Sequence, residues 1–345
     1  MSLRSRLIAL GLAAAVAAMA GWGVVTFFFT DSAPPNLPSL SASIRHDSIR
    51  VGEIERTYLF YVPATLSPHP GVLFVLHGAR GTGRRMRVLT AYEFEEFADR
   101  RNFVIVYPDG FEGYWNDCRK FGSFAAKQRR VDDVQFIHVL VENLKTRFDV
   151  DSTRLFAMGF SNGGQMALRL AIELPDKLAG VAAVAANLPT AENSACNATA
   201  SPLAVMIVNG TADPVNRYAG GPVGWLGWVG WSSSGALRST MDTAKYFTDL
   251  AGYREHPQIY EYPRIHADET TSVERSTWLE DSSPEVIVYT IHGGGHTIPQ
   301  ANYRLRRILG ATARDIDCMV EVESFVDRQV ARLTSRKSDS AQSKP

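Results

Sequence analysis

A serine flanked by glycines is the feature of this sequence that points most directly to chemistry. Residues 159–163 read Gly-Phe-Ser-Asn-Gly, after the apolar run 154–158 and before the helix-compatible residues 165–171. A strand, a G-x-S-x-G turn and a helix form a nucleophile elbow, which exposes the serine hydroxyl at a sharp bend. Glycines are needed there because a Cβ would collide with the strand or the helix. We therefore predict that Ser161 is a catalytic nucleophile rather than part of a structural turn.

A serine hydroxyl needs a base to remove its proton and an acid to orient that base. Asp213 follows the apolar run 203–208, and His296 follows the apolar run 285–291. The chain order Ser, Asp, His occurs in one large class of serine hydrolases. Each of these residues follows a predicted strand, so parallel strands would bring them to the same edge of a sheet. We predict a triad of Ser161, Asp213 and His296.

Two other histidines, and a second role for the aspartate, are alternatives to this triad. His292 and His296 are four residues apart, a metal-binding spacing on a helix, but three intervening glycines disfavour a helix. His292 still belongs to the predicted strand, which favours His296 as the base. His77 precedes the serine and breaks the chain order, so we predict that it holds a loop. Asp213 precedes a proline, and capping of a turn is the alternative role for it.

The loop 76–83, Leu-His-Gly-Ala-Arg-Gly-Thr-Gly, is the candidate partner of the elbow in stabilising negative charge. Acyl transfer places charge on the former carbonyl oxygen, which two backbone N–H groups usually receive. We predict that one donor is the N–H of Asn162, directly after the nucleophile. The second should be the N–H of Ala79, with Arg80 as the alternative.

The first thirty residues form a separate segment. Arg4 and Arg6 precede an apolar run over residues 7–29. As a helix this run would be about 34 Å long, enough to cross a bilayer core of about 30 Å. We predict a signal-anchor or signal peptide over residues 1–30 and favour the uncleaved anchor, although Ala-Met-Ala at 18–20 offers a cleavage site. The leading arginines would keep the start cytoplasmic and send the remainder outside.

Composition indicates one globular domain after this segment. The chain has 345 residues, 45% hydrophobic and 21% charged, and 36 Lys and Arg balance 36 Asp and Glu. The formal net charge is therefore zero, and no overall positive charge favours binding of nucleic acid. We predict a Ser/Pro-rich tether over 31–43, a catalytic domain over 44–334 and a disordered tail over 335–345.

Three cysteines suit an extracytoplasmic location. An odd number allows one disulfide and one free thiol, and an oxidising exterior would permit the bridge. Cys118 and Cys196 lie in loop-like sequence and are the preferred pair. Cys318 falls in a helical pattern, where we predict a buried, inert thiol. No spacing among the three resembles a zinc site.

Strands and helices alternate along the predicted domain. An opening hairpin is predicted at 48–51 and 56–62, followed by strands at 71–76, 103–107, 153–158, 181–186, 203–208 and 285–291. Helices are predicted at 86–101, 131–148, 237–250 and 315–333, besides the one after the elbow. This alternation predicts an α/β fold, with a mostly parallel central sheet and helices on both faces.

Eight segments occur in an order that is typical of one family. They are Leu-His-Gly at 76–78, Tyr-Pro-Asp-Gly at 107–110, Trp-Asn at 115–116, Val-Asp-Asp-Val at 131–134, Ser-Asn-Gly-Gly at 161–164, Gly-Thr-Ala-Asp-Pro at 210–214, Gly-Gly-Gly-His-Thr at 293–297 and Asp-Ile-Asp at 315–317. In these the chain, from about residue 46 to 330, resembles the polyhydroxybutyrate-depolymerase-like and feruloyl-esterase-like branch of the α/β-hydrolases. The resemblance implies the α/β-hydrolase fold, the triad Ser161, Asp213 and His296, no metal and no organic cofactor. It also implies hydrolysis of hydroxycinnamoyl esters on plant polysaccharides or of short hydroxyalkanoate esters.

Two features depart from the family pattern. Ile298 stands where the family often has a tryptophan, which would remove an aromatic platform. A Gly-Trp-rich loop at 224–231 follows Asp213, and its tryptophans would either line an acyl pocket or pack against the domain or membrane-proximal surface. The candidate pocket residues are Trp115, Trp225, Trp228 and Ile298.

The sequence thus predicts an exported serine esterase, membrane-tethered in preference to secreted, which cleaves a small-molecule or polymeric ester through an acyl-enzyme. One alternative is a non-catalytic envelope protein that keeps the scaffold for binding. The other is a peptidase or thioesterase, since scaffold and triad do not determine the acyl group.

Overall fold

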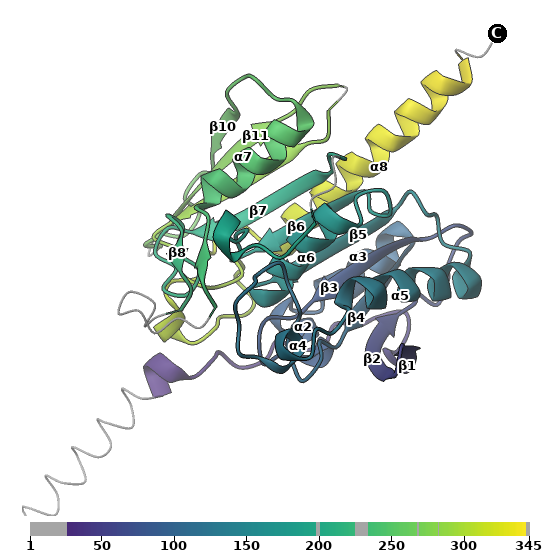
Figure 1. The fold of residues 1–345 in the computed structure, drawn as a ribbon, viewed down its shortest axis with the longest axis horizontal. Coiled ribbons are helices and arrows are strands. Elements are labelled where there is room, and N and C mark those ends of the chain that lie inside the picture. The colour runs from purple at the N-terminus through teal and green to yellow at the C-terminus, as the bar shows by residue number, and fades with distance from the viewer. Residues whose placement is uncertain (1–25, 198–200, 225–233, 268, 282, 343–345) are drawn as a thin grey trace, which may run out of the picture.

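One ten-stranded sheet organises the computed structural model, which describes residues 26–342 apart from residues 198–200, 225–233, 268 and 282 (Figure 1). In spatial order the strands are β1 (Arg45–Val51), β2 (Ile54–Tyr61), β4 (Phe103–Pro108), β3 (Gly71–Leu76), β5 (Leu155–Phe160), β6 (Gly180–Val184), β7 (Ala204–Gly210), β12 (Val286–His292), β11 (Ser272–Trp278) and β10 (Gln258–Glu261). A separate two-stranded pair is formed by β8 (Gly221–Pro222) and β9 (Ala236–Leu237).

The middle of the sheet is parallel. Neighbouring strands pair in parallel from β4 through β3, β5, β6 and β7 to β12, whereas β1, β2, β11 and β10 are antiparallel at the two edges. Every residue of β3, β4, β5, β6 and β7 is buried, as expected of strands covered on both faces. The predicted mostly parallel sheet is confirmed. Its carboxyl edge collects the residues that follow each parallel strand.

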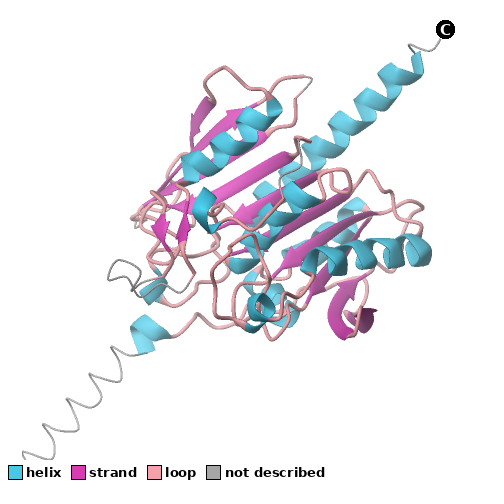
Figure 2. Ribbon diagram, in the orientation of Figure 1, coloured by secondary structure: helices cyan, strands magenta, loops and turns pink. Residues whose placement is uncertain are grey.

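Helices cover both faces of this sheet and enclose two apolar cores (Figure 2). One core includes buried side chains of α5 (Asp133–Phe148), α6 (Asn162–Glu173) and α7 (Thr240–Ala251). The other includes side chains of α2 (Gly83–Leu89), α3 (Glu93–Arg101) and α8 (Cys318–Gln342). Short helices are also formed by α4 (Ala125–Gln128), η1 (Ala191–Asn193) and η3 (Arg307–Leu309).

The single helix predicted over 86–101 is instead two helices, α2 and α3. Ala91 and Tyr92 between them adopt positive φ values of 50° and 64°, which end the first helix without a glycine or proline. The bend is held by Arg87, whose guanidinium lies 5.2 Å from the Tyr92 ring and donates to buried Glu95. The break therefore depends on tertiary contacts that a local pattern does not carry.

Residues 31–43 and 335–342 lie on either side of the catalytic domain. Asp31 accepts a hydrogen bond from Arg306 N–H and pairs with Arg85, and Ser41 N–H donates to Asp99, so the segment 31–43 is attached to the domain. Helix α8 extends to Gln342, and the disorder predicted for residues 335–345 stays a prediction.

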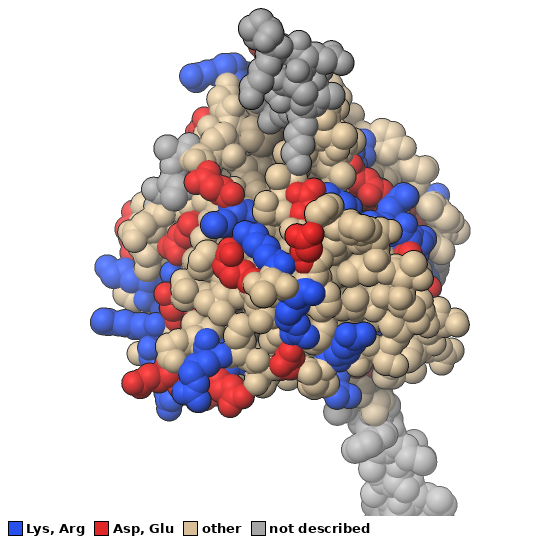
Figure 3. Space-filling view, turned by 90° about the vertical axis from the view of Figure 1, so that its right-hand side faces the viewer, with Lys and Arg blue, Asp and Glu red and all other residues tan. Residues whose placement is uncertain are grey.

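No helix among the described residues is long and apolar enough to span a membrane. The predicted anchor lies almost entirely in residues 1–25, outside the described residues. On the face drawn in Figure 3, acidic and basic side chains are interspersed, in agreement with the equal numbers of both kinds in the sequence.

Candidate active site

Ser161 occupies a strained turn between β5 and α6. Its φ of 56° and ψ of −119° are unusual for a residue with a side chain. The two glycines of the motif explain how the turn closes. A Cβ on Gly159 would lie 2.1 Å from the Gly163 carbonyl oxygen, and one on Gly163 would lie 2.3 Å from that of Leu76. Only glycine at both positions lets the strand, the helix and the neighbouring β3 approach this closely.

The structure brings Ser161, His296 and Asp213 together. His296 Nε2 lies 2.8 Å from Ser161 Oγ, and His296 Nδ1 lies 2.7 Å from Asp213 Oδ2. Asp213 and His296 follow the adjacent parallel strands β7 and β12, and Ser161 follows β5. The histidine and the aspartate are buried, with 5% and 4% exposure. A hydroxyl, an imidazole and a carboxylate in one hydrogen-bonded chain can generate an alkoxide nucleophile.

The hydrogen bond to Asp213 determines which imidazole nitrogen of His296 carries the proton. Asp213 Oδ1 accepts hydrogen bonds from the N–H groups of Val215 and Asn216, at 2.7 and 2.8 Å. The other carboxylate oxygen, Oδ2, accepts from Nδ1–H of His296. Nε2 is then unprotonated in the neutral ring and can accept the proton of Ser161.

The loop that carries His296 is braced by a neighbouring segment. His296 N–H donates to the Leu309 carbonyl at 2.7 Å, and Gly295 N–H donates to that of Ala311 at 2.8 Å. A Cβ on Gly295 would lie 2.1 Å from the Leu309 oxygen, so glycine permits this approach. The competing histidine, His292, points elsewhere: its side chain is half exposed, and Nε2 lies 3.9 Å from Glu274.

His77 holds the loop after β3, as the sequence predicts. It is fully buried, accepts a hydrogen bond from Gly110 N–H at Nε2 (2.8 Å) and donates from Nδ1 to the Gly78 carbonyl (2.7 Å). This loop adjoins the elbow, because a Cβ on Gly78 would lie 3.4 Å from Cβ of Ser161. Ala79 and Arg80 follow directly, and Arg80 has a positive φ of 58°. Burial lowers the pKa of His77, so the ring is neutral.

His77 should therefore make the protein less stable in mild acid. The unfolded state binds a proton as the pH falls below about 6.5, whereas the folded ring stays neutral, so the free energy of unfolding falls by up to about 1.4 kcal/mol per pH unit. We expect His77→Gln, which retains a donor and an acceptor, to reduce this slope. Urea unfolding of both proteins at pH 7.5 and 5 checks it. Equal slopes would show that His77 does not titrate on unfolding.

Two of the four candidate pocket residues, Trp115 and Ile298, are buried in the structure. Trp115 is fully buried, and its Nε1 donates to the His77 carbonyl at 2.8 Å, so it supports the loop instead of lining a pocket. Ile298 is 2% exposed and packs in the core on the side of α2, α3 and α8. Trp225 and Trp228 lie outside the described residues. A lone aromatic residue in a loop does not reveal whether it faces substrate or core.

The expected disulfide between Cys118 and Cys196 is present, and Cys318 is buried and free.

Sequence reasoning missed the residues on either side of Cys118, namely Asp117 and Arg119, which form a buried ion pair next to the elbow. Their only signal is a charged residue on each side of a cysteine. Among the described residues no group of three His, Cys, Asp or Glu side chains is arranged to hold a metal.

Known proteins match this chain in both sequence and fold. The phospholipase/carboxylesterase family model matches residues 62–221. NocK of Nocardia uniformis subsp. tsuyamanensis, named for an inferred esterase activity, is 31% identical over 249 residues, which are 70% of each chain. Feruloyl esterase B of Thermothelomyces thermophilus is 30% identical over 118 residues, 34% of this chain and 39% of that protein. The acetyl xylan esterase structure from Aspergillus awamori has a TM-score of 0.51 at 16% identity, covering 75% of this chain and 96% of that one.

Proposed function

Since the chain belongs to the phospholipase/carboxylesterase family of α/β-hydrolases and is a serine hydrolase of carboxylic esters, we propose that Ser161, His296 and Asp213 are its catalytic triad. The observation that supports this most directly is the hydrogen-bonded chain from Ser161 Oγ through His296 to Asp213, with links of 2.8 and 2.7 Å. A binding module has no need for these three groups in one hydrogen-bonded chain.

The reaction proceeds in two halves. Ser161 Oγ attacks the ester carbonyl carbon while its proton passes to His296 Nε2, and Asp213 stabilises the imidazolium. The tetrahedral intermediate collapses when the carbon–oxygen bond to the alcohol breaks and His296 protonates that oxygen. Water then attacks the acyl-enzyme, gives its proton to His296 and releases the acid, which restores the serine.

The negative oxygen of each intermediate is received by the N–H groups of Asn162 and Ala79. Asn162 is the first residue of α6, a helix of 12 residues, so its N–H has no partner within that helix. Ala79 follows Gly78, the glycine that adjoins Ser161. Each such donor typically contributes about 3 kcal/mol to lowering the barrier.

The proposed substrates are acetyl or hydroxycinnamoyl esters of carbohydrates. Relatives named as feruloyl and acetylxylan esterases support this class. Short hydroxyalkanoate esters are the second class, because of the sequence resemblance to polyhydroxybutyrate depolymerases.

A fluorophosphonate probe followed by an ester panel tests the proposed function. The probe should label Ser161 in the wild-type protein and nothing in Ser161→Ala, as mapped by peptide mass spectrometry. The panel compares p-nitrophenyl acetate, butyrate and decanoate with methyl ferulate, hydroxybutyrate oligomers, a thioester and a peptide. An unlabelled wild-type serine would favour the binding protein, and a preference for the thioester or peptide would overturn the ester assignment.

We also propose that the catalytic domain lies outside the cytoplasmic membrane, anchored by residues 7–29. The proposal is supported by the arginines that precede this apolar run and by the Cys118–Cys196 disulfide. The chain enters the domain at Asp31 and Ser32, and Ser32 N–H donates to the Arg304 carbonyl at 2.8 Å. Retention of the protein in membranes after an alkaline carbonate wash would support the anchor. A mature chain beginning after Ala20 would contradict it.

A further inference from the structure

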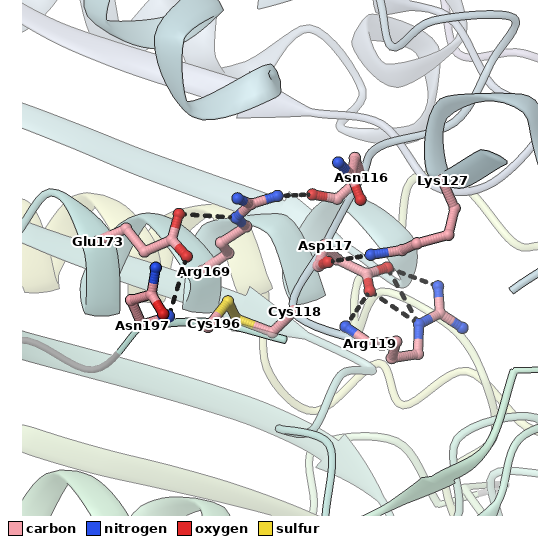
Figure 4. Close-up of a disulfide and its surroundings, with 9 residues drawn as sticks. All are labelled: Asn116, Asp117, Cys118, Arg119, Lys127, Arg169, Glu173, Cys196 and Asn197. Atoms are coloured by element: carbon pink, nitrogen blue, oxygen red, sulfur yellow. Dashed lines mark hydrogen bonds and ion pairs between the residues drawn. A yellow bond between two sulfur atoms is a disulfide. The ribbon is translucent and has the colours of Figure 1, made fainter. Parts of the chain in front are cut away.

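A buried ionic cluster lies beside the elbow and has no role in the chemistry described so far. Its centre is Asp117, whose carboxylate is completely buried. Arg119 donates to both oxygens, with Nε 2.9 Å from Oδ1 and Nη2 2.5 Å from Oδ2. Lys127 Nζ donates to the Asp117 carbonyl at 2.7 Å (Figure 4). A buried carboxylate is costly unless it is paired in this way, which raises the question of why it is there.

Asp117 reaches the residue that follows the nucleophile. Asn162 Nδ2 donates to Asp117 Oδ2 at 2.6 Å. The same amide exchanges hydrogen bonds with the backbone of Trp115, which donates to Oδ1 at 2.8 Å and accepts from Nδ2 at 3.1 Å. Asn162 is 3% exposed, and both polar atoms of its amide are engaged, so its side-chain orientation is determined. Its backbone N–H belongs to the first residue of α6, adjacent to Ser161.

The segment 115–117 also contacts the second proposed oxyanion loop. Trp115 Nε1 donates to the His77 carbonyl at 2.8 Å, and the two rings lie 5.1 Å apart. His77 in turn holds Gly78, directly before Ala79. One segment therefore supports the residues that carry both proposed donors.

A disulfide fixes the position of this cluster. Cys118 lies between Asp117 and Arg119 and is bonded to Cys196, with 5.0 Å between the Cα atoms (Figure 4). Ala195 N–H donates to the Cys118 carbonyl at 2.8 Å. The loop that carries Asp117 is thus attached to a second loop more than seventy residues away in sequence, as expected where a side chain must be placed accurately.

The cluster keeps Asp117 ionised. Burial by itself raises the pKa of Asp117, but the charges of Arg119 and Lys127 outweigh it and leave the pKa below its usual value. Burial also lowers the pKa of Lys127 to about 8, partly offset by the attraction of Asp117. An ionised acceptor makes the hydrogen bond from Asn162 stronger than one between neutral groups.

We propose that Asp117 is a positioning residue, whose carboxylate holds the Asn162 side chain so that the Asn162 N–H points at the developing oxyanion. The proposal rests on the proposed function, because it assumes that Asn162 supplies an oxyanion donor. Asp117 does not touch the substrate; it acts only through Asn162. Deleting an oxyanion donor typically lowers kcat by 10²- to 10³-fold. Displacing the donor should cause part of that loss.

Asp117→Asn tests this role because it keeps the shape and removes the charge. We expect kcat for p-nitrophenyl acetate to fall by about 10- to 100-fold while KM changes by less than about threefold. Inhibition by phenylboronic acid, which forms a tetrahedral adduct with a catalytic serine, should weaken by about the same factor as kcat/KM. A merely structural role would lower the amount of folded protein without changing the affinity of the folded fraction.

Glu285→Gln is the matched control. Glu285 is also a buried carboxylate paired with an arginine, Arg328, at 3.0 Å, but it lies directly before β12, at the opposite end of that strand from the loop of His296. It should lower the thermal midpoint by a comparable amount and leave kcat of the folded protein within about twofold. Unchanged kcat in Asp117→Asn, or an equal loss of kcat in both variants, would overturn the proposal.

Asn162→Ala keeps the test decisive if Asp117→Asn does not fold. This variant removes the amide that Asp117 holds but leaves the backbone N–H and the Asp117–Arg119 pair in place. It should show the same loss of kcat and of boronate affinity, and full activity would overturn the proposal. If Asp117→Asn also folds, the double variant should be no worse than either single one. Failure of the wild-type serine to react with fluorophosphonate would instead overturn the proposed function.

Discussion

Ser161→Ala should lower kcat for p-nitrophenyl acetate by about six orders of magnitude, the largest effect expected of any single substitution. The hydroxyl is the atom that forms the acyl-enzyme, and a methyl group offers no replacement. The backbone should not move, because alanine has the same Cβ and meets the same positive φ of 56° at this position. Steady-state hydrolysis and the thermal midpoint together measure the change.

A serine outside the site provides the control for this substitution. Ser239 caps α7, since its Oγ accepts a hydrogen bond from Asp242 N–H at 2.9 Å. Ser239→Ala should lower the free energy of unfolding by about 1 kcal/mol and leave turnover within about twofold. The two variants thus separate a loss of chemistry from a loss of stability. Hydrolysis by Ser161→Ala above about 1% of wild type would mean that another nucleophile carries the reaction.

The candidate triad could be predicted because its signals are local and its geometry follows from topology. Glycines around Ser161 and an apolar run before each triad residue are visible in sequence. Once those runs are parallel strands, their carboxyl ends must share one edge, which brings Asp213 and His296 next to each other from β7 and β12. No side-chain packing has to be known for this step.

The buried supports of the site could not be predicted, because they depend on contacts between distant segments. Asn162 and Asp117 are 45 residues apart, and their hydrogen bond has no periodic signature. Trp115 is one of the predicted pocket residues, and tryptophan suits both a core and a binding surface. Its burial is determined by His77 and the elbow, which approach it only in the folded protein.

The antiparallel strands β10 and β11, at one edge of the sheet, were not predicted for a different reason. All four residues of β10 are exposed, and β11 mixes buried and half-buried positions, so neither carries the apolar run by which the central strands were recognised. These strands are specified by pairing with β12 and not by their own composition. They lie on the far side of β12 from β7 and β5, so their omission did not disturb the prediction of the site.

His296→Gln should lower kcat by about four to six orders of magnitude, which tests the identity of the base. The glutamine amide can still accept from Ser161 or donate to Asp213, but it cannot take up a proton near neutral pH, so the serine remains a neutral alcohol during attack.

His292→Gln distinguishes this effect from a general sensitivity of the glycine-rich loop. His292 lies four residues earlier, at the end of the same strand, but its side chain is half exposed and faces Glu274 across 3.9 Å. Its replacement should leave kcat within about twofold. The opposite result, with activity lost in His292→Gln and kept in His296→Gln, would require the loop to rearrange on substrate binding. That rearrangement would have to break the 2.7 Å hydrogen bond from His296 N–H to Leu309, and the burial of His296 argues against it.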